Sequence, residues 1–285
     1  MRAGIAGLLP ADPAAITTEH ARHLRALGFT GASVFSGNPA QVSEAALRHA
    51  RDVLAGEGIR VAQTNPTYPA LVHPDTQQRA EGVRLAQRAC HVARLLDAVY
   101  LLVRSGSVNP AGNYTPHREN HTPAAIERLI DSLRQVCAAA EHEGVLVGLE
   151  CHVITTLDSP RRVREIIEAV GSPALRYNAD PVNFVGSFAQ AYNSTALVHE
   201  IFAELGPWMI SAHIKDVSLG NRLVVHIDEC VPGEGIFDLA TFLRLYEQYH
   251  PEKYALIEHL PDSKVPAAKA HVDVLLAQLG LAWRV

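Results

Sequence analysis

Short apolar runs alternate with longer amphipathic segments along the whole chain. The apolar runs predict strands at residues 2–8, 31–35, 59–64, 98–103, 145–150, 174–179, 209–214 and 254–258. The segments with helical spacing of apolar positions span residues 14–27, 40–56, 75–95, 122–143, 159–170, 194–205, 238–249 and 264–279. Eight strands, each followed by a helix, predict an α/β fold: a single (β/α)8 TIM barrel that forms one domain over residues 1–285.

Helix-start and helix-stop signals fall at the ends of these segments. Proline stands near the first helical position after Asp12, Thr122 and Ser159, and Asp238 begins the seventh helix. Glycines follow several of the predicted helices, where a C-cap or a strand lead-in is expected; these are Gly28, Gly58, Gly144, Gly171 and Gly206.

Four polar residues stand where the last four apolar runs reach their carboxyl ends. They are Glu150, Asp180, His213 and Glu258. In a TIM barrel the carboxyl ends of the strands meet at the face that carries active sites. Three carboxylates and an imidazole in one place would repel one another or be desolvated unless a cation held them. We therefore predict one bound divalent metal, with Mn²⁺ as the expected ion and Mg²⁺ or Co²⁺ as alternatives.

The composition predicts a globular protein that acts on a small molecule. Hydrophobic residues make up 48% of the chain and charged residues 19%, which is enough to form a large core. The formal net charge is −5 and no run of Lys or Arg occurs, which argues against nucleic acid and acidic membranes as partners. No Gly-rich phosphate-binding motif indicates a nucleotide cofactor.

The cysteines and the apolar runs predict a cytoplasmic location. The four cysteines are far apart and form no C-x-x-C pair, so they are expected to be reduced thiols. The apolar N-terminus is short, is interrupted by glycine and lacks a cleavage site, so it is expected to be the first strand. No apolar run approaches the roughly 20 residues of a membrane-spanning helix. Whether the protein forms a homo-oligomer is left open.

The C-terminal half of the chain resembles the xylose-isomerase-like TIM barrels. This superfamily includes sugar phosphate isomerases and epimerases, tagatose 3-epimerases, inosose dehydratases and apurinic endonucleases. The resembling segments are residues 148–152 (GLECH), 177–183 (YNADPVN), 213–216 (HIKD), 232–238 (PGEGIFD) and 257–259 (IEH). The N-terminal half resembles the superfamily by its architecture only.

This resemblance implies a divalent-metal-dependent isomerase or epimerase of keto-sugars. It implies that Glu150, Asp180, His213 and Glu258 hold the metal, which chelates a carbonyl oxygen and the neighbouring hydroxyl. The C–H bond between them becomes acidic because the metal stabilises the enediolate. Glu150 and Glu258 would then be the catalytic groups that remove and return the proton.

His152 favours an alternative reaction class. It lies two residues after Glu150 and would share its face in a strand. An imidazole can act as a third proton-transfer group near neutral pH. A metal-dependent lyase, dehydratase or decarboxylase, acting on a keto-sugar, keto acid or 3-keto-glycoside, needs such a group. His152 could equally orient the substrate or a metal ligand.

Five further residues are predicted to bind the substrate. Lys215 returns to the face of His213, whereas Asp216 points away and could fix the following loop. The others are Asn65, Asn183, Arg222 and His226. Three long loops at the same face, residues 104–121, 180–193 and 215–237, are expected to surround the site, and the first is polar enough to form a lid.

Two other functions were weighed. The apurinic-endonuclease relatives use a three-metal cluster with more histidines than this chain offers at the corresponding strand ends, although His226 and Asp228 resemble their paired His and Asp. A binding protein that has lost catalysis would lack a catalytic carboxylate, and both Glu150 and Glu258 are present.

Overall fold

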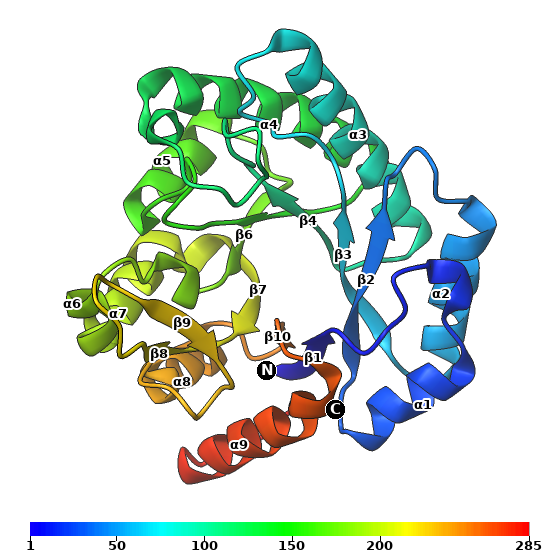
Figure 1. Ribbon diagram of the computed structural model, residues 1–285. Helices are drawn as coiled ribbons and strands as arrows, with labels where there is room; N and C mark the ends of the chain where they lie inside the picture. Colours follow the sequence, from blue (N-terminus) through cyan, green and yellow to red (C-terminus); the bar gives the residue numbers. More distant parts are fainter. Residues whose placement is uncertain (285) are drawn as a thin grey trace.

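Eight parallel strands close into a barrel with helices around its outer face (Figure 1). The computed structural model describes residues 1–284. Around the barrel the strands follow the order β1, β10, β7, β6, β5, β4, β3 and β2. Their bounds are Arg2–Ala6 (β1), Gly31–Gly37 (β2), Arg60–Pro66 (β3), Tyr100–Arg104 (β4), Val147–Glu150 (β5), Leu175–Ala179 (β6), Met209–Ile214 (β7) and Tyr254–Glu258 (β10). The predicted TIM barrel and all eight of its predicted strands are confirmed.

All eight predicted helices are present. They are Thr18–Ala26 (α1), Glu44–Gly56 (α2), Thr76–Leu95 (α3), Pro123–Glu143 (α4), Pro160–Val170 (α5), Ser194–Leu205 (α7), Leu239–Tyr249 (α8) and Val265–Gln278 (α9). The helices α4 and α5 end at Gly144 and Gly171, whose φ angles of 69° and 71° are left-handed and favour glycine.

The start of the first helix differs from the prediction. Asp12 caps a 3-10 turn, Pro13–Ala15 (η1), and not an α-helix. Ile16 is then extended and fully buried, so the chain bends inward before Thr17 caps α1. The Asp12-Pro13 pair therefore begins a 3-10 turn, and the buried Ile16 separates that turn from the α-helix.

The loops at the carboxyl ends of the strands contain structure that the periodicity did not predict. After β7, the chain forms an antiparallel hairpin of Asp216–Leu219 (β8) and Ile227–Cys230 (β9). After β6 come the 3-10 turn Val182–Phe184 (η3) and the short helix Phe188–Tyr192 (α6). Further 3-10 turns are Arg118–His121 (η2), Gly206–Trp208 (η4) and Asp262–Lys264 (η5).

The core lies between the barrel and the inner faces of the helices. Every residue of β5, β7 and β10 is buried, because these strands face the barrel interior on one side and helices on the other. Polar residues at the carboxyl ends of these strands are therefore buried as well. Among residues 1–284, none of the helices combines the length and the apolar character that crossing a membrane requires.

Candidate metal centre

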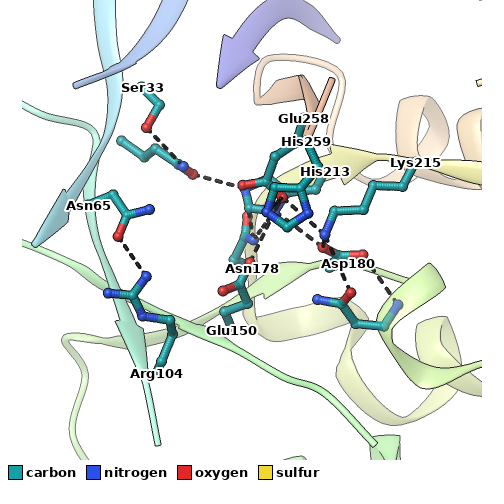
Figure 2. A network of polar contacts seen from close by, with 12 residues as sticks. Ser33, Asn65, Arg104, Glu150, Asn178, Asp180, His213, Lys215, Glu258 and His259 are labelled. Atoms are coloured by element: carbon teal, nitrogen blue, oxygen red, sulfur yellow. Dashed lines mark hydrogen bonds and ion pairs between the residues drawn. The ribbon is translucent and has the colours of Figure 1, made fainter. Parts of the chain in front are cut away.

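Glu150, Asp180, His213 and Glu258 converge at the carboxyl end of the barrel (Figure 2). One potential ligand atom from each lies within 4.8 Å of the other three. His213 Nδ1 is 3.3 Å from Glu150 Oε1, 3.3 Å from Asp180 Oδ2 and 2.8 Å from Glu258 Oε2. All four residues are buried. Within residues 1–284 this is the one group of at least three such side chains that could hold a metal ion.

The cluster requires positive charge. Burial alone lowers the pKa of His213, but the charge of Glu258 and hydrogen bonds to Asp180 and Glu150 outweigh burial and raise its pKa well above the ordinary value. Burial likewise raises the pKa of Glu258, but His213 and Lys215 overcome it and hold this pKa well below the usual range. In the protein alone, protonated His213 and Lys215 supply the charge that a metal ion would supply.

Lys215 reaches the cluster as predicted from its spacing. Its Nζ lies 2.8 Å from Asp180 Oδ2 and 3.2 Å from Glu258 Oε2, and donates to Asn183 Oδ1 at 3.3 Å. The side chain is 1% exposed, so these carboxylates hold the ammonium inside the protein. Asp216 points away and accepts hydrogen bonds from backbone N–H groups of the following loop.

The residues fit a divalent cation. Three carboxylates and an imidazole are the donors that such ions accept, and His213 directs one ring nitrogen at all three carboxylates. Glu258 Oε2 is buried and has no hydrogen-bond partner, although it lies within ion-pair distance of His213 and Lys215. A buried carboxylate oxygen without a hydrogen bond is well suited to coordinate a cation.

A second layer of polar groups orients His213, and the sequence reasoning missed it. His213 Nε2 lies 2.9 Å from Gln63 Oε1, and Gln63 Nε2 donates to Ser33 Oγ at 3.0 Å. Gln63 Oε1 also accepts from the hydroxyl of Tyr100. A fixed acceptor at Nε2 leaves Nδ1 for the metal, as is common for ligating histidines. In the sequence, Gln63 is one polar residue within a predicted strand, and nothing about it indicates a contact with His213.

Tyr114 brings the predicted lid loop into contact with the cluster. Its hydroxyl donates to Glu150 Oε2. The residue is 42% exposed, but desolvation of its hydroxyl, followed by the nearby Glu150 charge, raises the pKa of Tyr114 above its ordinary value, so the hydroxyl keeps its proton. The loop itself is anchored by buried Asn120, which accepts from Val108 N and donates to the Ile154 carbonyl.

His152 lies beside this tyrosine, with ring centroids 6.0 Å apart in an edge arrangement. Strand β5 ends at Glu150, so His152 belongs to the following turn and not to the strand. Burial lowers the pKa of His152, which keeps the imidazole neutral near pH 7. A neutral imidazole can accept a proton.

The remaining predicted substrate-binding residues fall into two groups. Asn183 and Asn65 lie at the barrel mouth, where Asn183 accepts from Lys215 and Asn65 accepts from Arg104 Nη1 at 2.8 Å. Arg222 and His226 lie on the β8–β9 hairpin. Arg222 pairs there with Asp228 at 2.6 Å and is more than half exposed. Within residues 1–284 no hydrogen bond or ion pair joins Arg222 or His226 to the cluster; Arg222 pairs with Asp228, and the His226 carbonyl accepts from Gly220 N.

Comparisons with known proteins agree with this fold. The profile of the xylose isomerase-like TIM barrel family matches residues 21–277. No curated protein matches the chain by sequence.

Among solved structures, a D-tagatose 3-epimerase-like protein superposes with a TM-score of 0.76 at 15% identity, over 98% of each chain. The probable 3-DHS dehydratase AsbF from Bacillus anthracis gives 0.72 at 15% identity, over 96% of this chain and 98% of that one. A Mycobacterium smegmatis xylose isomerase-like protein in complex with magnesium gives 0.70 at 19%, over 92% and 87%. At these identities the likeness establishes the fold.

Proposed function

The chain belongs to the xylose isomerase-like TIM barrel family, and from this premise we propose that it is a divalent-metal-dependent isomerase or epimerase of keto-sugars. The observation that carries the proposal is the convergence of Glu150, Asp180, His213 and Glu258 within 4.8 Å of one another. A structural neighbour that is a tagatose 3-epimerase-like protein supports this proposal, whereas the dehydratase neighbour agrees with the second candidate below.

These four side chains would hold the metal, with Mn²⁺ as the expected ion. When bound there, a divalent ion supplies Lewis-acid polarisation of the substrate oxygens. The magnesium in one structural neighbour supports a hard divalent cation in this fold family. We propose that Mg²⁺ or Co²⁺ can replace Mn²⁺, since all three accept oxygen and imidazole donors.

The two glutamates are placed to move a proton. They stand at the two ends of the arc β10, β7, β6 and β5, so they approach the mouth of the barrel from different sides. Glu258 would coordinate through Oε2, which has no hydrogen bond, and its second carboxylate oxygen would accept a proton from substrate carbon. Glu150 Oε2 accepts from Tyr114, which holds the carboxylate in one orientation. Removal by one glutamate and return by the other would invert a stereocentre.

Glu258→Gln tests this assignment. The amide keeps the shape of the side chain but cannot accept the proton, so turnover should be lost while much of the substrate affinity remains. Metal-loaded protein would be incubated in D₂O with a panel of ketoses, inososes, keto acids and 3-keto-glycosides, followed by NMR and mass spectrometry. Metal content must be measured in the same samples, because Glu258 is also a proposed ligand.

The matched control is Glu200→Gln. Glu200 is an exposed glutamate on α7, outside the four-residue cluster. The Glu200→Gln variant should exchange deuterium as the unaltered protein does. Near-normal turnover in metal-loaded Glu258→Gln would show that the proton takes another route.

A lyase or dehydratase is the second candidate, because neutral His152 offers a third proton-transfer group beside Glu150 and Tyr114. Such a reaction breaks a carbon–oxygen or carbon–carbon bond; neutral His152 would first take a proton from the substrate as a base and then donate it to the leaving group as an acid. Loss of mass in the same D₂O experiment would identify it.

A further inference from the structure

Arg104 lies at the carboxyl end of β4, next to the candidate metal centre. It is the register partner of Glu150 on β5, so the two side chains leave the barrel wall on the same face. Figure 2 shows Arg104 and Asn65 on the side of the cluster opposite Lys215. The side chain of Arg104 is partly buried.

The hydrogen-bond partners of the Arg104 guanidinium group are neutral, and the charge of Glu150 acts on it only from beyond ion-pair distance. Its Nη1 donates to Asn65 Oδ1 at 2.8 Å, its Nη2 donates to the Pro66 carbonyl, and its Cζ lies 5.8 Å from the centre of the Tyr68 ring. Its Nε is buried and has no hydrogen-bond partner. Within residues 1–284 no carboxylate forms an ion pair with Arg104. A partly buried arginine normally has such a partner, because desolvating an unpaired charge is costly.

The charges at the barrel mouth balance without Arg104. The carboxylates of Glu150, Asp180 and Glu258 carry three negative charges. Lys215 and the proposed divalent ion would carry one and two positive charges, so the formal sum is zero. Arg104 adds one positive charge beside the place where the substrate would bind. Its planar fork of N–H donors matches the oxygens of a carboxylate or phosphate.

We propose that Arg104 binds an oxyanion group of the substrate, so that the protein acts on an acidic keto-sugar. This inference rests on the proposed function, because it names the substrate class of the same site. The oxyanion is a carboxylate in a sugar acid or a phosphate in a sugar phosphate. Tyr114 donates to Glu150 and also interacts with Arg104, so it links the guanidinium group to the candidate metal centre.

Three ketoses that differ at one carbon test the proposal. D-Fructose, D-fructuronate and D-fructose 6-phosphate carry a hydroxymethyl, a carboxylate and a phosphate at C6. Their binding to the Mn²⁺-loaded protein would be measured by calorimetry. We expect one of the two acids to bind at least about tenfold more tightly than D-fructose, the typical contribution of a charged hydrogen bond. A preference for D-fructuronate identifies a carboxylate, and a preference for D-fructose 6-phosphate identifies a phosphate.

Arg104→Gln should reduce this preference to less than about twofold, because the amide carries no charge for the oxyanion. Arg128→Gln is the matched control. Arg128 is also partly buried and donates to a backbone carbonyl, that of Val72 at 2.9 Å, but it lies on α4 outside the cluster. This variant should keep the full preference.

The proposal is overturned if the unaltered protein shows no preference for either acid, if neither acid binds, or if Arg104→Gln keeps the preference. Deuterium exchange in the same samples separates the two hypotheses. If deuterium exchanges but neither acidic ketose binds more tightly than D-fructose, the isomerase proposal stands and the role of Arg104 is refuted. If an acidic ketose binds more tightly in an Arg104-dependent way but no ketose exchanges deuterium, the isomerase proposal is refuted and the role of Arg104 remains.

Discussion

At the scale of single residues, His152 distinguishes the two enzyme classes. Its imidazole is neutral because burial lowers its pKa, and it stands beside Tyr114, which contacts Glu150. In an isomerase the two glutamates complete the proton transfers. In a lyase or dehydratase, the neutral imidazole would take a proton from the substrate and pass it to the leaving group.

We therefore expect His152→Ala to reduce kcat/KM by about tenfold in an isomerase, the usual effect of losing a supporting contact near a metal site. In a lyase the same change should cost about 10²- to 10⁴-fold, the usual contribution of general acid–base catalysis. Steady-state kinetics on the substrate identified in D₂O would measure the effect. The control is His199→Ala, on the exposed face of α7, which should leave kcat/KM unchanged. A loss of several hundredfold with the metal still bound would favour the lyase.

At the scale of elements, Asp216 connects β7 to the loop that closes the barrel mouth. Its carboxylate accepts from the backbone N–H groups of Val217, Gly233, Gly235 and Phe237, at 2.8 to 3.1 Å. This side chain is 1% exposed. One carboxylate therefore fixes the loop that follows the β8–β9 hairpin.

Asp216→Asn should lower the free energy of unfolding by about 2–4 kcal/mol, because the amide offers one acceptor where the carboxylate offers two and leaves buried N–H groups without partners. Urea unfolding measures the change. Asp228→Asn, which breaks only the exposed pair with Arg222, should change it by less than about 0.5 kcal/mol. Equal effects of the two substitutions would contradict the role given to Asp216.

His250, at the end of α8, should make the stability depend on pH. Its Nε2 lies 2.9 Å from the Gly206 carbonyl at the turn before β7. Burial, with a contribution from Lys253, lowers the pKa of His250 to about 4. The unfolded chain, whose histidine pKa is about 6.5, thus binds the proton more readily than the folded protein. The stabilising contribution of this histidine is complete above about pH 6.5 and is lost as the pH falls towards 4.

His250→Gln keeps a donor for Gly206 but does not titrate. Between pH 7.5 and 4.5 the melting temperature of this variant should therefore fall less than that of the unaltered protein. His199→Gln should show the same pH dependence as the unaltered protein, because His199 is exposed. Superposable pH profiles for all three proteins would refute the prediction.

At the scale of the whole molecule, the candidate metal centre connects four of the eight barrel strands. Its ligands lie on or directly after β5, β6, β7 and β10, which are neighbours in the barrel. A metal ion bound only by the folded barrel must stabilise it. At a free Mn²⁺ concentration of about 100 times the dissociation constant, the gain is about 2.7 kcal/mol.

Thermal unfolding with Mn²⁺ and with a chelator would measure this gain. Asp180→Asn should abolish most of it, whereas Asp131→Asn, on the exposed face of α4, should keep it. A melting temperature that does not respond to Mn²⁺, Mg²⁺ or Co²⁺ would exclude the proposed centre.

The barrel and its candidate metal ligands could be predicted from the order of the residues alone. Periodicity along a chain reports which residues face the core, and the parallel barrel then places every strand end at one face. Lys215 was predicted at the cluster for the same reason, since alternate residues of a strand share a face. The hairpin β8–β9 was not predicted, because its strands are short and partly exposed and lack a strong apolar pattern.

Which polar groups surround these ligands depends on how the strands meet in the folded barrel. Gln63, Tyr100 and Arg104 come from β3 and β4, far from His213 and Glu150 in the chain, and their contacts arise only when the barrel closes. Arg222, in contrast, pairs with Asp228 of its own hairpin and does not reach the cluster. A strand pattern specifies the direction of a side chain but not its partner, since the partner depends on which strand lies alongside and on the path of each loop.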